Sequence, residues 1–378
     1  MAPRHHDLTD STAGHVAPPV TGEALAGYLR GQATEFLRAL RLHRETGGGQ
    51  NGSGGGTADA VDPARALRRS ARRISGSLHT FRPLLDPGWS EEIRPELAWV
   101  SGTLALEHAC ASRLERLLLA LQRLSGATVI PAQAPGTATG AAGGTAVSVA
   151  GSRKAAAPGA ANTAPDRGNL TVGAAKAGAL LDRQLTLART RAHSTALQAL
   201  GSSRFHAVAD KVAVLASEVP LTPHAATADP RPLAAAAEER LADAVAALPL
   251  VTAGHPYNAE ALIHGLSPDP SPHPQDAPWH QVRLLLRLHR YALEVLHGDD
   301  GPYGDDGRLL PAGQALDRHR DASEAAAAAA QAARTPRIAP ATAYALGVLH
   351  ADQRHEVEAA RYAFRHAWQK QTVGTTTS

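Results

Sequence analysis

The sequence lacks the features that hold together a disulfide-bonded or a membrane-spanning protein. It contains one cysteine, Cys110, among 378 residues, so no intrachain disulfide can form. No stretch approaches the roughly 18 uninterrupted apolar residues of a membrane span. The opening residues MAPRHHDLTD have no apolar core of a signal peptide. We therefore expect a soluble protein of a reducing, cytoplasmic compartment.

Aromatic residues are also scarce, at 4 % of the chain, and long β-branched runs of the kind that form sheets are missing. Alanine, leucine and arginine abound, and these residues lose little side-chain entropy when a helix forms. Apolar residues recur at helical spacing in several segments. The sequence predicts an all-α fold with helices at about 21–45, 62–81, 90–123, 172–200, 204–218, 232–247, 279–296, 308–333 and 341–370.

Four segments lack the large apolar side chains whose burial offsets the entropy of ordering. They are the N-terminus 1–20, a glycine-rich linker 46–60, a low-complexity insertion 126–168 and the tail 371–378. We predict that these segments are disordered or flexible.

Most positive charge in the chain comes from arginine, which supplies 34 of the 38 basic residues, while the net charge is only +3. The planar guanidinium offers a fork of donors that suits phosphate oxygens better than an ammonium does. The placement of these arginines therefore says more about a partner than the net charge does.

The segment WHQVRLLLRLHRYALEVL, residues 279–296, gathers its cations on one face of a helix. At 100° per residue, four basic side chains fall within an arc of roughly 80°, namely His280, Arg283, Arg287 and Arg290. A solvated helix face usually interleaves acids with bases, yet Glu294 is the only acid here. A solvated face remains the plain alternative, but cations one turn apart repel each other, which favours contact with a polyanion.

An earlier segment repeats this spacing. Residues 61–85 hold six arginines against the single acid Asp62. Three of these arginines follow the same steps of three and four, and two others widen the basic face: Arg65, Arg68 and Arg72, with Arg69 and Arg73. We interpret the repeat as an internal duplication with one basic helix in each half, the first half spanning 21–218 and the second 219–370.

These segments resemble the CHAD domain, the conserved-histidine α-helical domain. HQVRLLLRLHRYALEV matches the family pattern H-x-x-R-x-x-x-[RK]-x-x-R, and ARALRRSARRISGSLHTFRPLL, residues 64–85, is similar to the first-half counterpart with its TFRPLL ending. The resemblance covers roughly residues 21–370, apart from the two Gly- and Ala-rich insertions.

The resemblance implies two four-helix bundles related by pseudo-twofold symmetry, with basic residues of the two motif helices lining a surface between them. It also implies binding of inorganic polyphosphate and association with polyphosphate granules. Carried over by position, the implied polyphosphate ligands are Arg65, Arg68, Arg72, Arg73, His280, Arg283, Arg287 and Arg290.

The chain departs from the family pattern mainly in its first half. Arg65 stands at the histidine position, and Ser75 stands at a later arginine position. The segment 104–114 has lost the arginine and both acids of the family's L-G-x-x-R-D-x-D, while 316–323 keeps only Asp321. A polyanion site tolerates such changes, so we expect the first half to bind more weakly.

Signatures of catalysis and of metal binding are missing. Ala360 breaks the E-x-E-x-K pattern of triphosphate-tunnel enzymes, and there is no Walker A or G-x-S-x-G motif. His350 and His355 are five residues apart and do not form an H-E-x-x-H zinc helix. We expect no enzymatic activity, no cofactor and no metal ion.

Two other partners remain open on the sequence alone. A nucleic acid would also be attracted by the basic face, although single strands usually need aromatic platforms, and the two stripes offer only Phe81 and Tyr291. If the basic face nevertheless binds such a strand, the protein is a nucleic-acid-binding protein. Alternatively, it is a non-catalytic scaffold whose basic faces bind acidic segments of other proteins.

Overall fold

The computed structural model describes residues 21–46, 62–126, 164–266, 273–298 and 307–369. Within these ranges the chain is helical, and an isolated antiparallel bridge between Leu85 and Leu221 is its one β-type contact. The all-α fold predicted from the sequence is confirmed. In the same ranges, no helix has both the length and the apolar character that crossing a bilayer requires.

The α-helices are α1 (Gly22–Glu45), α2 (Pro63–Thr80), α3 (Pro87–Ser125), α4 (Ala164–Leu200), α5 (Ser203–Ser217), α6 (Arg231–Ala246), α7 (Ala259–Gly265), α8 (Ala277–His297), α9 (Leu309–Ala333) and α10 (Pro340–Gln369). Short 3-10 helices stand at η1 (Arg82–Leu84), η2 (Thr252–Gly254) and η3 (Pro274–Asp276).

Side chains of the sequence fix several of these helix starts. Asp62 accepts a hydrogen bond from the backbone N–H of Ala64 at 3.0 Å, and Pro63 occupies the first helical position of α2. Asp86 caps α3 in the same way through Trp89, at 2.7 Å. Both caps satisfy backbone donors that the first helical turn leaves without a partner.

The predicted boundaries were wrong at two places. α4 begins at Ala164, although the sequence predicted disorder to residue 168 and a helix only from about 172. Pro165 lies in the first turn of α4, where a proline removes no helical hydrogen bond, so the helix extends through this polar stretch. In addition, α7 forms between residues 247 and 279, where no helix was predicted. The other predicted disordered segments fall almost wholly outside the described residues.

Three apolar cores decide how the helices pack. The first joins α1, α2 and α5 to the adjoining ends of α3 and α4, around Phe36, Phe81 and Phe205. The second is rich in alanine and packs the far ends of α3 and α4 against α9 and α10. The third surrounds Trp279 and Phe364, between α6, α8, α9 and α10. The long helices α3 and α4 therefore connect the helices of the first half to those of the second.

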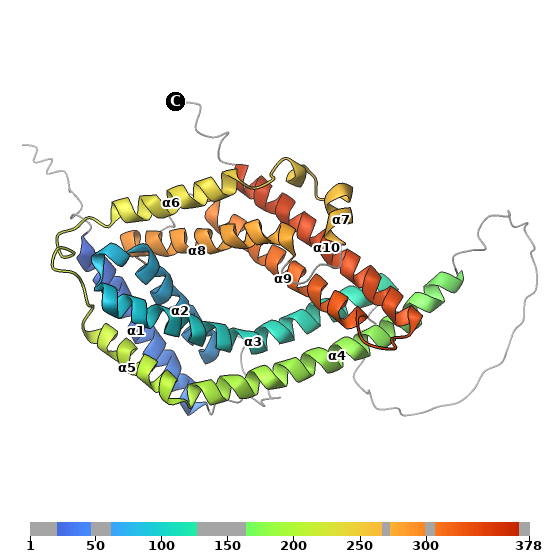
Figure 1. Ribbon diagram of the computed structural model, residues 1–378, viewed down its shortest axis with the longest axis horizontal. Coiled ribbons are helices and arrows are strands. Elements are labelled where there is room, and N and C mark those ends of the chain that lie inside the picture. Colours follow the sequence, from blue (N-terminus) through green and yellow to red (C-terminus); the bar gives the residue numbers. More distant parts are fainter. Residues whose placement is uncertain (1–20, 47–61, 127–163, 267–272, 299–306, 370–378) are drawn as a thin grey trace, which may run out of the picture.

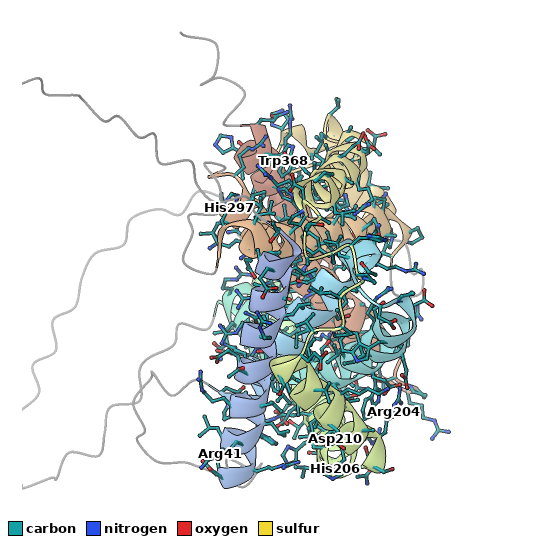
Figure 2. All side chains as sticks on the ribbon, turned by 90° about the vertical axis from the view of Figure 1, so that its left-hand side faces the viewer. Arg41, Arg204, His206, Asp210, His297 and Trp368 are labelled. Atoms are coloured by element: carbon teal, nitrogen blue, oxygen red, sulfur yellow. The ribbon has the colours of Figure 1, made fainter. Side chains whose placement is uncertain are left out.

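The helices follow one another around a ring. In Figure 1, α6 and α8 form its upper side, α9 and α10 its right side, and α3 and α4 its lower side. Figure 2 turns this view so that α1 and α5, which are in contact, face the viewer, with Arg41 and His206 at the same end of the molecule. α2 lies inside the ring, where it reaches α8.

Candidate polyanion-binding site

α2 and α8 cross in close contact, and this crossing brings the two predicted basic rows together. A Cβ atom on Gly76 of α2 would lie 2.6 Å from the ring of Tyr291 and 3.3 Å from Leu288, both of α8. A residue without a Cβ allows such a close approach of two helices. Rows that stand about 210 residues apart in the sequence are therefore neighbours in the fold.

Basic side chains of three helices form what we call the arginine cluster. Each of its six members is repelled by the charge of at least one other member. Five were predicted from the sequence, namely Arg65, Arg68 and Arg72 of α2 with Arg283 and Arg287 of α8. The sixth is Arg320 of α9, which was not predicted. Repulsion of this kind requires short separations in a poorly solvated environment. The cluster is thus a shared feature of both halves of the chain.

Burial and mutual repulsion make the positive charges of the arginine cluster energetically unfavourable in the folded protein. Burial, followed by the charge of Arg283, lowers the pKa of Arg287 to about 10. Burial also lowers the pKa of Arg72 and of Arg68, and neighbouring arginines add to the effect on both. The three guanidinium groups remain protonated at neutral pH, but loss of water and mutual repulsion destabilise their charged form.

Three members of the cluster have donors that the fold leaves without a partner. The Nε atoms of Arg68, Arg72 and Arg287 are buried, and none meets a hydrogen-bond acceptor in the described part of the chain. A buried donor without an acceptor costs roughly 1–3 kcal/mol, and more when it is charged. The described part of the protein therefore leaves these three donors unsatisfied.

Other predicted ligands are engaged with protein side chains. Arg73 binds the buried carboxylate of Glu294 through Nε at 3.0 Å and Nη2 at 3.1 Å, and Tyr28 donates to the same carboxylate at 2.7 Å. This contact ties α2 to α8 on the side away from the cluster. Arg283 makes an ion pair with Asp317 of α9, at 2.6 Å, while remaining near Arg72 and Arg287.

The two remaining predicted ligands lie beside α9. The ring of His280 contacts the edge of the His319 ring, with centroids 5.5 Å apart, and burial is the first cause that lowers its pKa. Arg290 lies near Gly313. The structure thus brings Arg65, Arg68, Arg72, Arg283 and Arg287 together, and the charges of Arg283 and Arg320 also act on His280. Arg73 is bound to Glu294 instead, and Arg290 lies beside α9.

A cavity of about 390 Å³ adjoins the arginine cluster between α2, α3 and α8. Arg72 and Arg287 line it and also belong to the cluster. Its further lining residues are Ser75, Gly76, His79, Arg94, Ala98, Ser101, Leu284, Leu288 and Tyr291. The cavity therefore has basic residues from all three helices and no carboxylate in its lining.

The CHAD domain family matches residues 51–305. The chain belongs to the CHAD domain family. A solved structure, PptA from Streptomyces chartreusis, is 67 % identical, with 93 % of this chain and 100 % of that chain covered and a TM-score of 0.71. The CHAD domain from the plant Ricinus communis is 17 % identical, with 92 % and 91 % covered and a TM-score of 0.47. The comparison with curated proteins gave no match.

The N-terminal end of α8 in this CHAD protein is anchored by a buried ion network. Asp276 is fully buried and accepts hydrogen bonds from Arg354 at 2.7 Å and from Arg361 at 2.6 Å, both of α10. Burial raises the pKa of Asp276, but hydrogen bonds from His319 and Arg354, together with their charges, hold it far below its ordinary range. The network fixes the first turn of α8, and with it the direction of the basic row.

Sequence reasoning missed four basic side chains near the cluster. Arg320 of α9 could have been found, because it lies one residue before Asp321 in the family-like segment 316–323. His108, which lies 3.1 Å from Arg65, and Arg94 both belong to α3, which carries no basic stripe. His79 continues the α2 row by one turn beyond Ser75. No group of three His, Cys, Asp or Glu side chains in the described residues is arranged to hold a metal.

Proposed function

We propose that this CHAD protein binds inorganic polyphosphate in the arginine cluster. The observation that carries the proposal is the set of buried Nε donors without a partner on Arg68, Arg72 and Arg287. Phosphate oxygens accept from guanidinium groups in charge-assisted and often bidentate hydrogen bonds. A bound polyanion would satisfy these donors and neutralise the repulsion between the two helices.

The shape of the cluster favours a linear polymer of phosphate. The cations extend along two crossing helices, so one phosphate would leave most of them uncompensated. A chain with a negative charge on each repeat unit can contact α2 and α8 at once. Its binding should release counterions, so the affinity should fall steeply with salt concentration.

Inorganic polyphosphate fits the cluster better than a single-stranded nucleic acid does. Bases need exposed aromatic rings on which to stack. Phe81 is fully buried in the first core, and the ring of Tyr291 packs against Gly76 at the helix crossing. The two aromatic residues named from the stripes are therefore used for packing, and phosphate contacts carry the recognition.

We also propose that the protein binds polyphosphate without catalysing a reaction on it. The cluster supplies cations that bind, and we propose that the protein associates through them with polyphosphate granules rather than cleaving the polymer. An assay for phosphate released from long-chain polyphosphate tests this point, since release above the rate without protein would indicate an enzyme.

Competition binding with two double variants tests the site. We expect Arg68→Ala with Arg72→Ala, and separately Arg283→Ala with Arg287→Ala, to weaken long-chain polyphosphate binding at least tenfold and to flatten its salt dependence. The matched control is Arg38→Ala with Arg41→Ala on α1, where both arginines are exposed and paired with nearby glutamates. Arg41 is labelled in Figure 2, where it lies at the lower end of the molecule together with His206.

The competitors decide between the partners. Unlabelled polyphosphate should displace the labelled chain at lower concentration than single-stranded RNA or a poly-glutamate peptide does. Stronger displacement by RNA would replace the proposal with nucleic-acid binding, and stronger displacement by the peptide would replace it with the scaffold. Far-ultraviolet circular dichroism of each variant must match the wild type, because loss of helix would make the arginines structural.

A further inference from the structure

The cavity between α2, α3 and α8 continues the arginine cluster toward α3, a helix that carries neither of the two basic stripes. Arg72 and Arg287 line both the cavity and the cluster, so a ligand held at these two groups reaches the cavity directly. Its volume of about 390 Å³ corresponds to roughly a dozen waters at about 30 Å³ each. This space is large enough for several phosphoryl groups.

The cavity has its own basic groups. Arg94 of α3 is half-buried and makes no hydrogen bond or ion pair with any residue that the structure describes. His79 of α2 lies one turn beyond Ser75, and burial and then the charges of Arg94, Arg240 and Arg82 lower its pKa. Positive charge therefore continues from the cluster through Arg94 toward Arg240 of α6, while the imidazole of His79 is largely neutral at pH 7 and can serve as a hydrogen-bond donor.

The walls of the cavity strengthen the field of these cations. Leu284, Leu288 and Ala98 line it together with the Tyr291 ring. The cavity is open to solvent on one side, where Leu284 and Ala98 are exposed. Apolar groups beside the cations lower the local dielectric constant, so a phosphate oxygen in the cavity would be attracted more strongly than at a fully exposed arginine. Since no carboxylate lines the cavity, nothing in the lining competes with an anion for Arg94.

We propose that the cavity is a second segment of the polyphosphate path, in which Arg94 and His79 hold the phosphoryl groups next to those held by Arg72 and Arg287. The inference rests on the proposed function. It adds a site on α3 that the two basic stripes do not include. It also implies that one chain passes along the cluster and then into the cavity between α2 and α3.

Thiol protection tests whether the polymer enters the cavity. Cys110→Ser removes the native thiol, and Ser101→Cys then places a single thiol in the cavity lining. We expect saturating long-chain polyphosphate to slow the reaction of this thiol with a neutral maleimide at least fivefold. The matched control is Ser217→Cys in the same Cys110→Ser background, on the exposed end of α5, whose rate should not change.

A charge deletion gives the second measurement. Arg94→Ala should weaken long-chain polyphosphate binding at least fivefold and flatten the log–log salt dependence by about 0.7, while Arg38→Ala of α1 should change neither. The inference is wrong if polyphosphate binds with wild-type affinity to the Ser101→Cys protein without protecting its thiol, or if Arg94→Ala binds normally.

The outcomes separate the inference from the proposed function. If the Arg283→Ala, Arg287→Ala protein loses binding while Arg94→Ala binds normally, the arginine cluster is the binding site and the cavity is not part of it. If the wild-type protein does not bind polyphosphate, both the proposed function and the inference about the cavity are wrong.

Discussion

Replacing Arg287 with methionine should stabilise the protein in the absence of ligand while removing much of its affinity for polyphosphate. Burial and the charge of Arg283 lower the pKa of Arg287 to about 10, well below the ordinary pKa of an arginine in the unfolded chain. Each pKa unit corresponds to about 1.4 kcal/mol, so the charge destabilises the folded state by up to about 3 kcal/mol. Methionine keeps an apolar stem of similar length and removes the charge.

The sign follows from proton linkage. Because the folded pKa of Arg287 is lowered to about 10, the unfolded chain binds more protons only above about pH 10, up to the higher pKa of an unfolded arginine, and stability rises with pH only in that window. At neutral pH both states carry the charge and the destabilisation is fully present. Methionine should therefore raise the free energy of unfolding at pH 7 by up to about 3 kcal/mol.

Urea unfolding followed by circular dichroism measures this effect, with Arg73→Met as the matched control. Arg73 is also a partly buried arginine of the predicted ligand set, but its removal leaves the buried carboxylate of Glu294 without its cation. Loss of one partner of a buried pair costs about 3–5 kcal/mol, so Arg73→Met should destabilise the protein. If Arg287→Met destabilises it to a similar extent, the account of an unpaired cation held for a ligand is refuted.

Three further predictions concern the surroundings of the cluster. Gly76→Ala should destabilise the protein by about 1–3 kcal/mol in urea unfolding, because the new Cβ would lie 2.6 Å from Tyr291; unchanged stability would show that the helices can separate without cost. Asp317→Asn should tighten polyphosphate binding by at most about fivefold in a titration at low salt, since it releases Arg283 from a partly exposed ion pair; weaker binding would contradict that reading. Burial lowers the pKa of His319 to about 4, so the unfolded chain binds more protons between that value and about 6.5, and stability should decline as pH falls through this window; His319→Gln should flatten the decline in urea midpoints measured against pH.

The local pattern of the sequence was sufficient for the helices and for the composition of the basic rows. Helix starts such as Asp62 and Asp86 depend on residues within one turn, so spacing and capping rules find them or come close. The start of α4 was missed because its first residues lack the apolar spacing on which the prediction relied. The family resemblance rested on the same local patterns, and the family match over residues 51–305 confirms it.

Two neighbouring arginines in α2 show that the local sequence pattern does not predict the tertiary partner of a side chain. Arg72 and Arg73 are adjacent in sequence and were predicted to share one role. In the fold, Arg72 lies in the cluster with a donor that has no partner, while Arg73 binds Glu294, which is 221 residues away. No spacing rule links these two positions, because the partner is decided by the rotation of α2 against α8.

The sequence by itself determined that the protein is helical, that its arginines fall in two stripes, and to which family it belongs, because these properties arise within single turns and short motifs. Tertiary packing alone decided which arginines remain unpaired, since burial and carboxylate partners are supplied by other helices. It also decided that Arg94 joins them, because α3 packs against α2 and lines the same cavity as the crossing of α2 and α8 at Gly76.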